Sequence, residues 1–376
     1  MRVLHICSGN LYGGIESIQL TFAGLRHECP EIEPEYSVCF EGRLSRDLKA
    51  SGVPVHNLGS VRVRNPISVW KARARLRKLL SESRYDAAIC YSTWTQAIFG
   101  PVTQAADVPL LFWLQDQPSG HHWLERWASR TRPEKVICCS EFTRSLLWKL
   151  YPGIPSDVIY APVPPIVKES VNSSQRIAIR KELQTPAEAV VIVQVSRMEA
   201  WKGHRFHLNA LAMMRDIPNW VCWFVGGAQR PAEERYLEEL KQSAEQYGIA
   251  DRLRFLGQRT DVRELMLSAD VFCQPNMGPE PFGVVFVEAL SAGLPIVTTA
   301  TGGGLEIVDS TCGLLIPAND VTALATAVRR LVLDNELRTR MSKAGPDRAR
   351  ALCDPTRQVR RLASVIESVF IQRGAA

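Results

Sequence analysis

Short runs of apolar, often β-branched residues alternate with helix-like segments along nearly the whole chain. Such runs are typical of parallel strands that helices cover on both faces. The first half predicts strands at 3–7, 36–40, 53–56, 87–91, 110–114, 135–139 and 158–160, with helices such as 15–27, 68–81 and 141–150. The second half predicts strands at 190–195, 221–225, 253–256, 271–274, 296–299 and 313–316. The pattern therefore predicts an α/β chain with two doubly wound, Rossmann-like domains.

Two segments between these series predict a linker, because 161–165 is rich in proline and 168–174 is polar. We expect an N-terminal domain over 1–165 and a C-terminal domain over 175–354. After Asp354 and Pro355, apolar residues recur at helical spacing over 356–371. We expect this last segment, 355–376, to form a helix that packs back on the N-terminal domain.

Composition excludes several classes of protein. The 376 residues carry 45 Lys and Arg against 39 Asp and Glu, and 46% of them are hydrophobic, as in ordinary globular chains. No apolar run approaches the roughly 18 residues of a membrane-spanning helix, and the N-terminus turns polar at Ser8, too early for a signal peptide. The ten cysteines are scattered, which favours reduced thiols. We expect a cytoplasmic protein with no nucleic-acid partner.

Two cations follow the buried strand predicted at 190–195. Arg197 and Lys202 lie in the loop directly after it. Ligands of open α/β sheets bind beyond the carboxyl ends of the strands, and two cations there suit a diphosphate. Solvated loop charges are the alternative explanation for this pair taken alone.

Two further loops of the second half carry groups that suit an anionic sugar ligand. Glu280, Gly283 and Glu288 lie around a predicted helix start, where backbone N–H groups favour an anion and a carboxylate can accept hydrogen bonds from hydroxyl groups. The segment 301–306 has three consecutive glycines, which offer backbone amides. An ordinary helix start and an ordinary glycine turn are the alternatives for each loop alone.

Together, and in this order, these loops resemble the nucleotide-sugar glycosyltransferases of the GT-B fold, specifically glycosyltransferase family 4. Glu280 and Glu288 match the Glu-x7-Glu motif of that family. The segment 196–203, Ser-Arg…Lys-Gly, matches its Gly-Arg…Lys-Gly element, and 302–306 fits its Gly-Gly-x-x-Glu loop. The resemblance implies two Rossmann-like domains that face each other across a cleft.

The resemblance also implies roles for individual residues. Arg197 and Lys202 would hold the donor diphosphate and stabilise the leaving group, Glu280 would contact the transferred sugar, and Glu288 would bind the ribose. We group Arg197, Lys202 and Glu280 as the catalytic set. The backbone near the donor would be that of Phe282, Gly283, Val284 and Gly303. The base would lie near 226–227 and 258–259.

The first half resembles the family less closely. The loop 8–16 places Gly13 and Gly14 at a helix start, like the Gly-Gly-x-Glu loop that faces the donor phosphates and the acceptor. Where family members often have a histidine, at the end of the fifth strand, this chain has Gln115. We therefore place Gln115, His121 and Ser140 on the acceptor side. His121 and His122 as exposed helix-start residues, and Ser140 as a helix N-cap, are the alternatives.

A basic stretch at 68–80 predicts a helix with a cationic outer face. We expect Trp70, Leu76, Leu79 and Leu80 to face the core. A cationic face of this kind can rest on anionic lipid headgroups, so we expect peripheral contact with the inner face of the membrane. A solvated charged face is the alternative.

The predicted function is transfer of a hexose from a nucleotide-diphosphate sugar, UDP- or GDP-linked, to a glycan or lipid-linked acceptor in polysaccharide or glycoconjugate biosynthesis. The resemblance implies retention of anomeric configuration. The sequence has no cluster of His, Asp and Cys residues at the spacing of metal ligands. We therefore expect no metal and no cofactor beyond the nucleotide-sugar co-substrate. A sugar-nucleotide epimerase or phosphorylase of the same fold, an NAD-dependent oxidoreductase and a non-catalytic nucleotide-sugar-binding protein remain alternatives.

Overall fold

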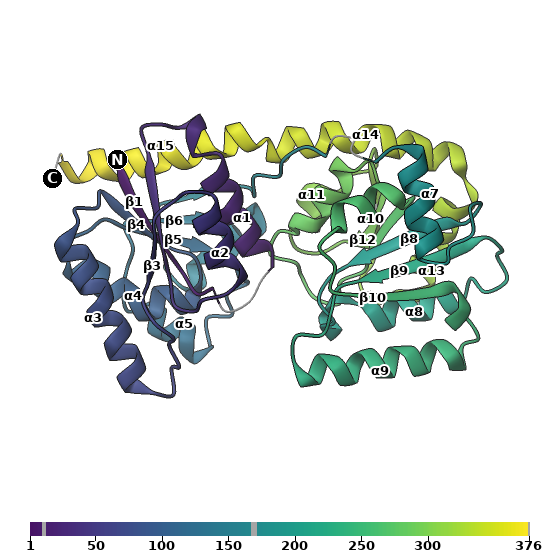
Figure 1. Cartoon of the computed structure of the whole chain (residues 1–376), viewed down its shortest axis with the longest axis horizontal. Coiled ribbons are helices and arrows are strands. Elements are labelled where there is room, and N and C mark those ends of the chain that lie inside the picture. The colour runs from purple at the N-terminus through teal and green to yellow at the C-terminus, as the bar shows by residue number, and fades with distance from the viewer. Residues whose placement is uncertain (10–12, 167–170, 375–376) are drawn as a thin grey trace. The chain divides into compact units, whose positions relative to one another are not determined.

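The computed structural model describes residues 1–9, 13–166 and 171–374, with side chains to residue 371. The chain forms two compact units (Figure 1). Unit 1 comprises Met1–Pro164 and Cys353–Ala376, and unit 2 comprises Pro165–Leu352. The sequence-based limits are 1–165 and 175–354, with a return of 355–376 to the first domain. Parts of the predicted linker 168–174 and of the loop 8–16 lie outside the described residues.

Unit 1 contains a seven-stranded parallel sheet in the order β3-β2-β1-β4-β5-β6-β7. The strands are β1 (Arg2–Cys7), β2 (Glu33–Val38), β3 (Val55–Asn57), β4 (Ala87–Cys90), β5 (Leu110–Leu114), β6 (Lys135–Cys138) and β7 (Ser156–Val158). The helices are α1 (Gly14–Gly24), η1 (Arg26–Glu28), α2 (Arg43–Ala50), α3 (Pro66–Glu82), α4 (Thr93–Ala105), α5 (Trp123–Ala128), α6 (Glu141–Leu146), η2 (Leu147–Lys149) and α15 (Pro355–Gly374). The last helix packs on this unit, where Lys135 Nζ donates to Ser368 Oγ over 3.1 Å.

Unit 2 contains a six-stranded parallel sheet in the order β10-β9-β8-β11-β12-β13. The strands are β8 (Val190–Val195), β9 (Trp220–Val225), β10 (Leu253–Gly257), β11 (Val271–Gln274), β12 (Ile296–Thr299) and β13 (Gly313–Ile316). The helices are α7 (Ser173–Glu182), η4 (Ala200–Lys202), α8 (His204–Ala212), α9 (Pro231–Gln246), η5 (Ala250–Arg252), α10 (Val262–Ser268), α11 (Val284–Ser291), α12 (Gly304–Ile307), α13 (Val321–Leu333) and α14 (Asn335–Cys353). Every predicted strand is present, with shifts of up to three residues at the ends, and the two Rossmann-like units are confirmed.

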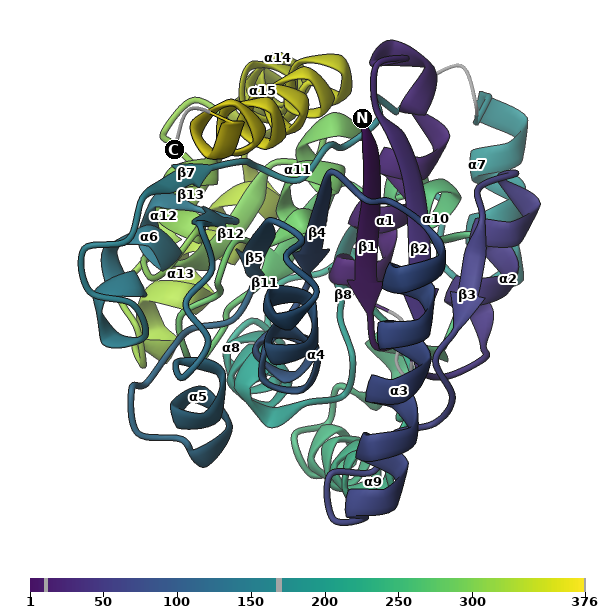
Figure 2. The ribbon, with the colours of Figure 1, turned by 90° about the vertical axis from the view of Figure 1, so that its left-hand side faces the viewer.

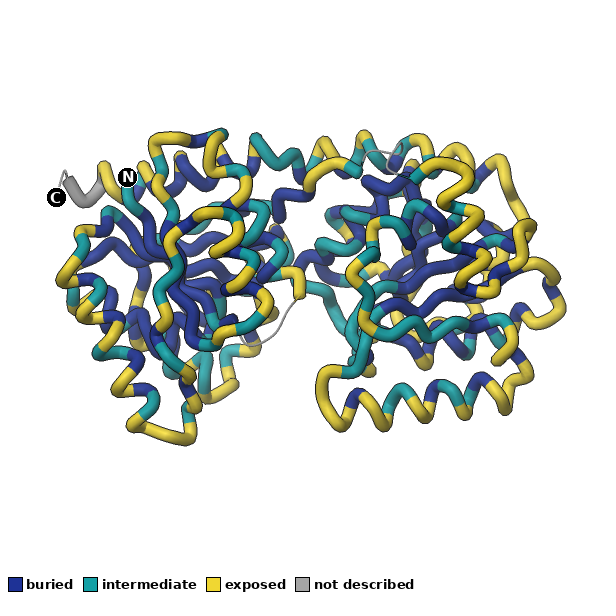
Figure 3. Tube along the Cα trace, in the orientation of Figure 1, coloured by how far each residue is buried: buried dark blue, intermediate teal, exposed yellow. Residues whose placement is uncertain are grey.

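The central strands of both sheets are buried, while the outer helices α3 and α9 alternate between buried and exposed positions (Figure 3). The strand order reverses between β1 and β4 in unit 1 and between β8 and β11 in unit 2. At such a point the loops after two adjacent strands diverge to opposite faces of the sheet, and this leaves a crevice for a ligand. Unit 2 therefore offers a binding place beyond Val195 and Gln274.

Helix α3, on the near side of unit 1 in Figure 2, corrects one prediction. Leu76 and Leu80 face the core as expected, but Leu79 is only half-buried and Trp70 is 67% exposed. The buried face runs through Val69 and Ala72 instead. One residue turns an α-helix by about 100°, so Trp70 cannot share the face of Val69 and points to the surface.

Candidate active site

Arg197 and Lys202 lie in the loop between β8 and α8, and the helical turn η4 carries Lys202. Gly203 ends this turn with a φ of 78°. A Cβ at this position would lie 1.9 Å from the carbonyl oxygen of Pro275, so only glycine fits there. The turn is thereby fixed against the loop that follows β11.

Each of the two cations is paired with an acid. Lys202 Nζ lies 2.6 Å from Glu280 Oε2, and Arg197 Nη2 lies 3.1 Å from Glu199 Oε1. The Lys202 and Glu280 side chains are 14% and 13% exposed, so water screens their attraction less than it would at the surface. Arg197 Nη1 is buried and has no hydrogen-bond partner among the described residues. The cluster therefore holds a donor that a bound anion could satisfy.

The Glu280 carboxylate is held from a second side by the loop after β11. Asn276 Nδ2 donates to Glu280 Oε2 over 2.9 Å, and Gln274 Nε2 donates to Asn276 Oδ1 over 3.2 Å. The backbone of Asn276 is itself fixed, because Thr299 Oγ1 donates to its carbonyl oxygen over 2.8 Å. A polar chain thus runs from the end of β11 to the carboxylate that faces Lys202.

The glycine loop after β12 packs directly on the Glu280 segment. Gly302 pairs with Glu280 in a parallel bridge, and the N–H of Gly303 donates to the Glu280 carbonyl oxygen over 2.8 Å. A Cβ on Gly302 would lie 2.4 Å from that oxygen. The glycines here let two backbones approach each other, and the Gly303 amide, which we expected to face an anion, is engaged within the protein.

Helix α11 begins at the segment that follows Glu280. Phe282 is buried, Gly283 is the N-cap, and Val284 is the first helical residue. Glu288 lies on the second turn and is half-buried. Loss of water around its carboxyl raises the pKa of Glu288 to about 7, although the charge of Arg263 acts in the opposite direction. A hydroxyl donor from a ligand would favour the ionised form of this group.

The loops after β8, β9 and β10 lie next to one another. Ser196 N donates to the Val225 carbonyl oxygen over 2.9 Å, and Gly226 N donates to the Gly257 carbonyl oxygen over 2.8 Å. Residues 226–227 and 258–259, where we expect the base, therefore follow neighbouring strands. Arg259 is paired with Asp261 over 2.6 Å.

In unit 1, Gly13 and Gly14 are exposed at the start of α1, where Gly13 N donates to Glu16 Oε2 over 2.9 Å. Gln115 follows β5 and is buried, and its Nε2 has no hydrogen-bond partner among the described residues. This amide can donate to a hydroxyl group that reaches it.

His121, His122 and Ser140 lie at helix starts in the same unit. His121 is exposed, and His122 is the exposed N-cap of α5, which agrees with the alternative interpretation of this pair. Ser140 is buried and caps α6, where its Oγ accepts from Thr143 N over 2.9 Å. The capping role of Ser140 is thus present in the structure.

Three residues of the unit 2 cluster were not predicted from the sequence. Glu199 and Trp201 lie between the two cations, and Asn276 follows β11. Trp201 Nε1 donates to Glu199 Oε2 over 3.0 Å. The position of all three, directly after central strands of the sheet, is the feature that could have identified them.

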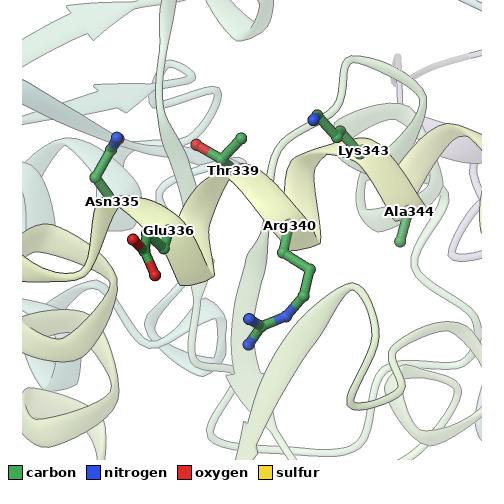
Figure 4. Close-up of a pocket in the computed structure, with 6 residues that line it drawn as sticks. All are labelled: Asn335, Glu336, Thr339, Arg340, Lys343 and Ala344. Atoms are coloured by element: carbon green, nitrogen blue, oxygen red, sulfur yellow. The ribbon is translucent and has the colours of Figure 1, made fainter.

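Features elsewhere in the described residues bear on metal binding, on membrane insertion and on a further surface hollow. Within 1–9, 13–166 and 171–374, no group of three or more His, Cys, Asp and Glu residues could hold a metal ion. None of the described helices combines the length and the apolar character that crossing a membrane requires. A shallow hollow on α14 is lined by Asn335, Glu336, Thr339, Arg340, Lys343 and Ala344, and shares no residue with the cluster around Lys202 (Figure 4).

Comparison with known proteins agrees with this geometry. Residues 175–348, nearly all of unit 2, match the family model of glycosyl transferases group 1. The chain is 27% identical over 357 residues to the lipopolysaccharide core biosynthesis glycosyltransferase LpsD of Rhizobium meliloti, covering 93% of each chain. It is 31% identical over 182 residues to LpsE of the same organism, and this match covers 48% of the chain and about half, 51%, of LpsE.

A solved structure shares the fold over almost the full length. The crystal structure of Anabaena Alr3699/HepE in complex with UDP-glucose matches with a TM-score of 0.86 at 23% identity, covering 98% of this chain and 100% of that one. The two Rossmann-like units and these matches define a glycosyltransferase of the GT-B fold. The match to the family model itself lies in unit 2.

Proposed function

We propose that this chain transfers a hexose from a nucleotide-diphosphate sugar to a glycan or lipid-linked acceptor in the assembly of lipopolysaccharide or another glycoconjugate. The observation that carries the proposal is the convergence of Arg197, Lys202 and Glu280 where the strand order of unit 2 reverses. The donor is UDP- or GDP-linked and needs no further cofactor. The similarity to LpsD and LpsE, which are named for lipopolysaccharide core biosynthesis, supports a role in lipopolysaccharide assembly. The UDP-glucose complex of HepE supports a nucleotide-diphosphate sugar as the donor.

The chemistry follows from the charges of the cluster. The bond between the anomeric carbon and the diphosphate oxygen breaks, and the departing nucleoside diphosphate gains negative charge. Arg197 and Lys202 stabilise that charge as it grows, which lowers the barrier. Glu280 contacts the transferred sugar and is not a covalent nucleophile. The oxygen of the acceptor hydroxyl group forms the new bond to the anomeric carbon on the face that the old one left, and its proton passes to the departing diphosphate oxygen. Configuration is retained, as in glycosyltransferase family 4.

In unit 2 the remaining donor contacts come from α11 and from the residues directly before it. We propose that Glu288 binds the ribose hydroxyls, and that the backbone of 282–284 lies at the diphosphate. The raised pKa of the Glu288 carboxyl supports this role, because a carboxyl short of water gains most from hydroxyl donors. The amide of Gly303 contributes only if its bond to Glu280 opens.

In unit 1 we propose that the acceptor meets Gln115, with His121 and Ser140 nearby, and that Gly13 and Gly14 approach the donor phosphates. The partnerless Nε2 of Gln115 supports the acceptor contact. A neutral amide can bond a sugar hydroxyl but cannot take its proton, as an imidazole can.

We further propose that α3, which contains the basic stretch 68–80, rests on an anionic membrane surface. On a helix, positions 67, 70, 71, 74, 77 and 78 share the face opposite the buried one. Ile67 and Trp70 are 64% and 67% exposed there, beside exposed Lys71, Arg77 and Lys78. Apolar side chains within a cationic face are the composition of an interfacial helix.

A donor and acceptor screen tests the transfer. The protein is incubated with UDP-, GDP- and ADP-linked hexoses, with and without a lipid-linked oligosaccharide, and sugar and nucleotide products are separated. Acceptor-dependent release of a nucleoside diphosphate together with a glycosylated acceptor is expected. Conversion of the donor sugar without an acceptor would instead identify an epimerase, and binding without turnover a non-catalytic protein.

A further inference from the structure

We infer that Trp201 is a positioning residue that holds the Lys202 ammonium group in place for the donor diphosphate. The inference rests on the proposed function, because it needs Lys202 to bind the diphosphate. Lys202 Nζ lies 3.8 Å from the centroid of the Trp201 ring, well inside the range of about 6 Å for a cation–π contact. The ring therefore attracts the ammonium group directly.

Trp201 is itself fixed at two points, one on its indole ring and one on its backbone. Its Nε1 donates to Glu199 Oε2 over 3.0 Å, and the Trp201 carbonyl oxygen accepts from Met277 N over 2.7 Å. The other oxygen of Glu199 faces Arg197 Nη2 at 3.1 Å. Through Glu199 and the indole, the two cations of the cluster belong to one connected arrangement.

A ring can do something here that a second carboxylate cannot. Lysine has a flexible four-carbon stem, and immobilising it on binding costs affinity. Glu280 already attracts the ammonium group, but its negative charge repels a diphosphate. The face of an indole attracts the cation through its quadrupole and carries no net charge. Trp201 can therefore preorganise Lys202 without opposing the anion that Lys202 is to bind.

The test measures affinity for UDP and GDP by calorimetry in wild type, Trp201→Leu and Trp201→Phe. Loss of the ring in Trp201→Leu is expected to weaken binding about 3- to 30-fold. Trp201→Phe, which keeps an aromatic face under Lys202, is expected to stay within about threefold of wild type. Trp148→Leu is the matched control, because Trp148 is 63% exposed in unit 1, outside the cluster.

A double-mutant cycle separates positioning from packing. In a Lys202→Met background, Trp201→Leu should cause no further loss of affinity, because the ring then has no cation to hold. An equal loss in both backgrounds would overturn the inference in favour of a packing role, as would wild-type affinity in Trp201→Leu. Should Trp201→Leu fail to fold, Trp201→Met replaces it in the same cycle. Wild-type nucleotide affinity in both Lys202→Met and Arg197→Ala would instead overturn the proposed diphosphate site.

Discussion

Lys202 Nζ lies 2.6 Å from Glu280 Oε2 although the two residues are 78 positions apart in the chain. Their loops follow β8 and β11, the neighbouring strands at which the strand order of unit 2 reverses. One ion pair thus brings together the side chain proposed for the diphosphate and the one proposed for the sugar.

Removal of the Lys202 ammonium group should abolish most of the activity. We expect Lys202→Ala to lower kcat about 100- to 1,000-fold, because one charge-stabilising donor is lost from the transition state. Steady-state kinetics with the donor found in the screen measures this, and circular dichroism checks the fold. Lys241→Ala, on exposed α9, is the matched control and should keep full activity. Near-normal turnover in Lys202→Ala would remove Lys202 from the site.

Neutralising Glu280 should separate nucleotide binding from sugar transfer. In Glu280→Gln the ammonium group loses its acid partner and remains available to a phosphate. We expect tighter binding of the nucleoside diphosphate, by about three- to tenfold, and a lower kcat. Calorimetry and kinetics on the same preparation measure both. Unchanged kcat with weaker nucleotide binding would contradict the assignment of Glu280 to the sugar.

The desolvated carboxyl of the half-buried Glu288 should make stability depend on pH. Its pKa is raised from 4.5 to about 7, so between these values the folded state binds more protons than the unfolded state. The free energy of unfolding therefore falls as the pH rises from about 4.5 to 7, by on the order of 2 to 3 kcal/mol.

The Glu288→Gln variant tests this dependence, because glutamine resembles the protonated acid. Its melting temperature should exceed that of wild type by several degrees at pH 8 and should match wild type near pH 4.5. Thermal denaturation followed by circular dichroism at both values measures the difference. An equal difference in melting temperature between variant and wild type at both pH values would argue against a desolvated carboxyl at Glu288.

The exposed apolar pair on α3 should govern membrane binding. We expect Ile67→Ser/Trp70→Ser to reduce binding to vesicles with anionic lipid at least tenfold, because two apolar side chains no longer leave water. Lys71→Gln/Arg77→Gln should also weaken binding, and more so at low salt. Flotation of the protein with vesicles measures both. Trp148→Ser is the control, and equal binding by all variants would rule out this face.

Most of the fold could be predicted from the sequence because the strands are continuous apolar runs. The prediction of 190–195, 271–274 and 296–299 agrees with β8, β11 and β12 residue for residue. Such runs are unmistakable where helices cover both faces of a sheet. The prediction that Trp70 faces the core was wrong. Cations lie on several sides of this helix, so its charge pattern does not show which face is buried, and the packing of Val69 and Ala72 decides it.

The candidate site was predicted only in part, for a related reason. Arg197 and Lys202 were found because they follow a strand, and their positions in one loop are local. The pairing of Lys202 with Glu280, and the chain from Gln274 through Asn276, depend on which strands become neighbours. The loop sequence alone also does not show whether the Trp201 ring lies against Lys202 or in the core.

The chain passes between the two units twice, at 164–165 and at 352–353, and Val163 N donates to the Cys353 carbonyl oxygen over 3.1 Å where the two passages meet. Unit 2 is therefore an insertion, which a single gene fragment could encode, whereas no uninterrupted fragment encodes unit 1 alone. On the ribosome, the sheet of unit 1 must wait for α15, which is synthesised after the whole of unit 2, before its own outer layer is complete.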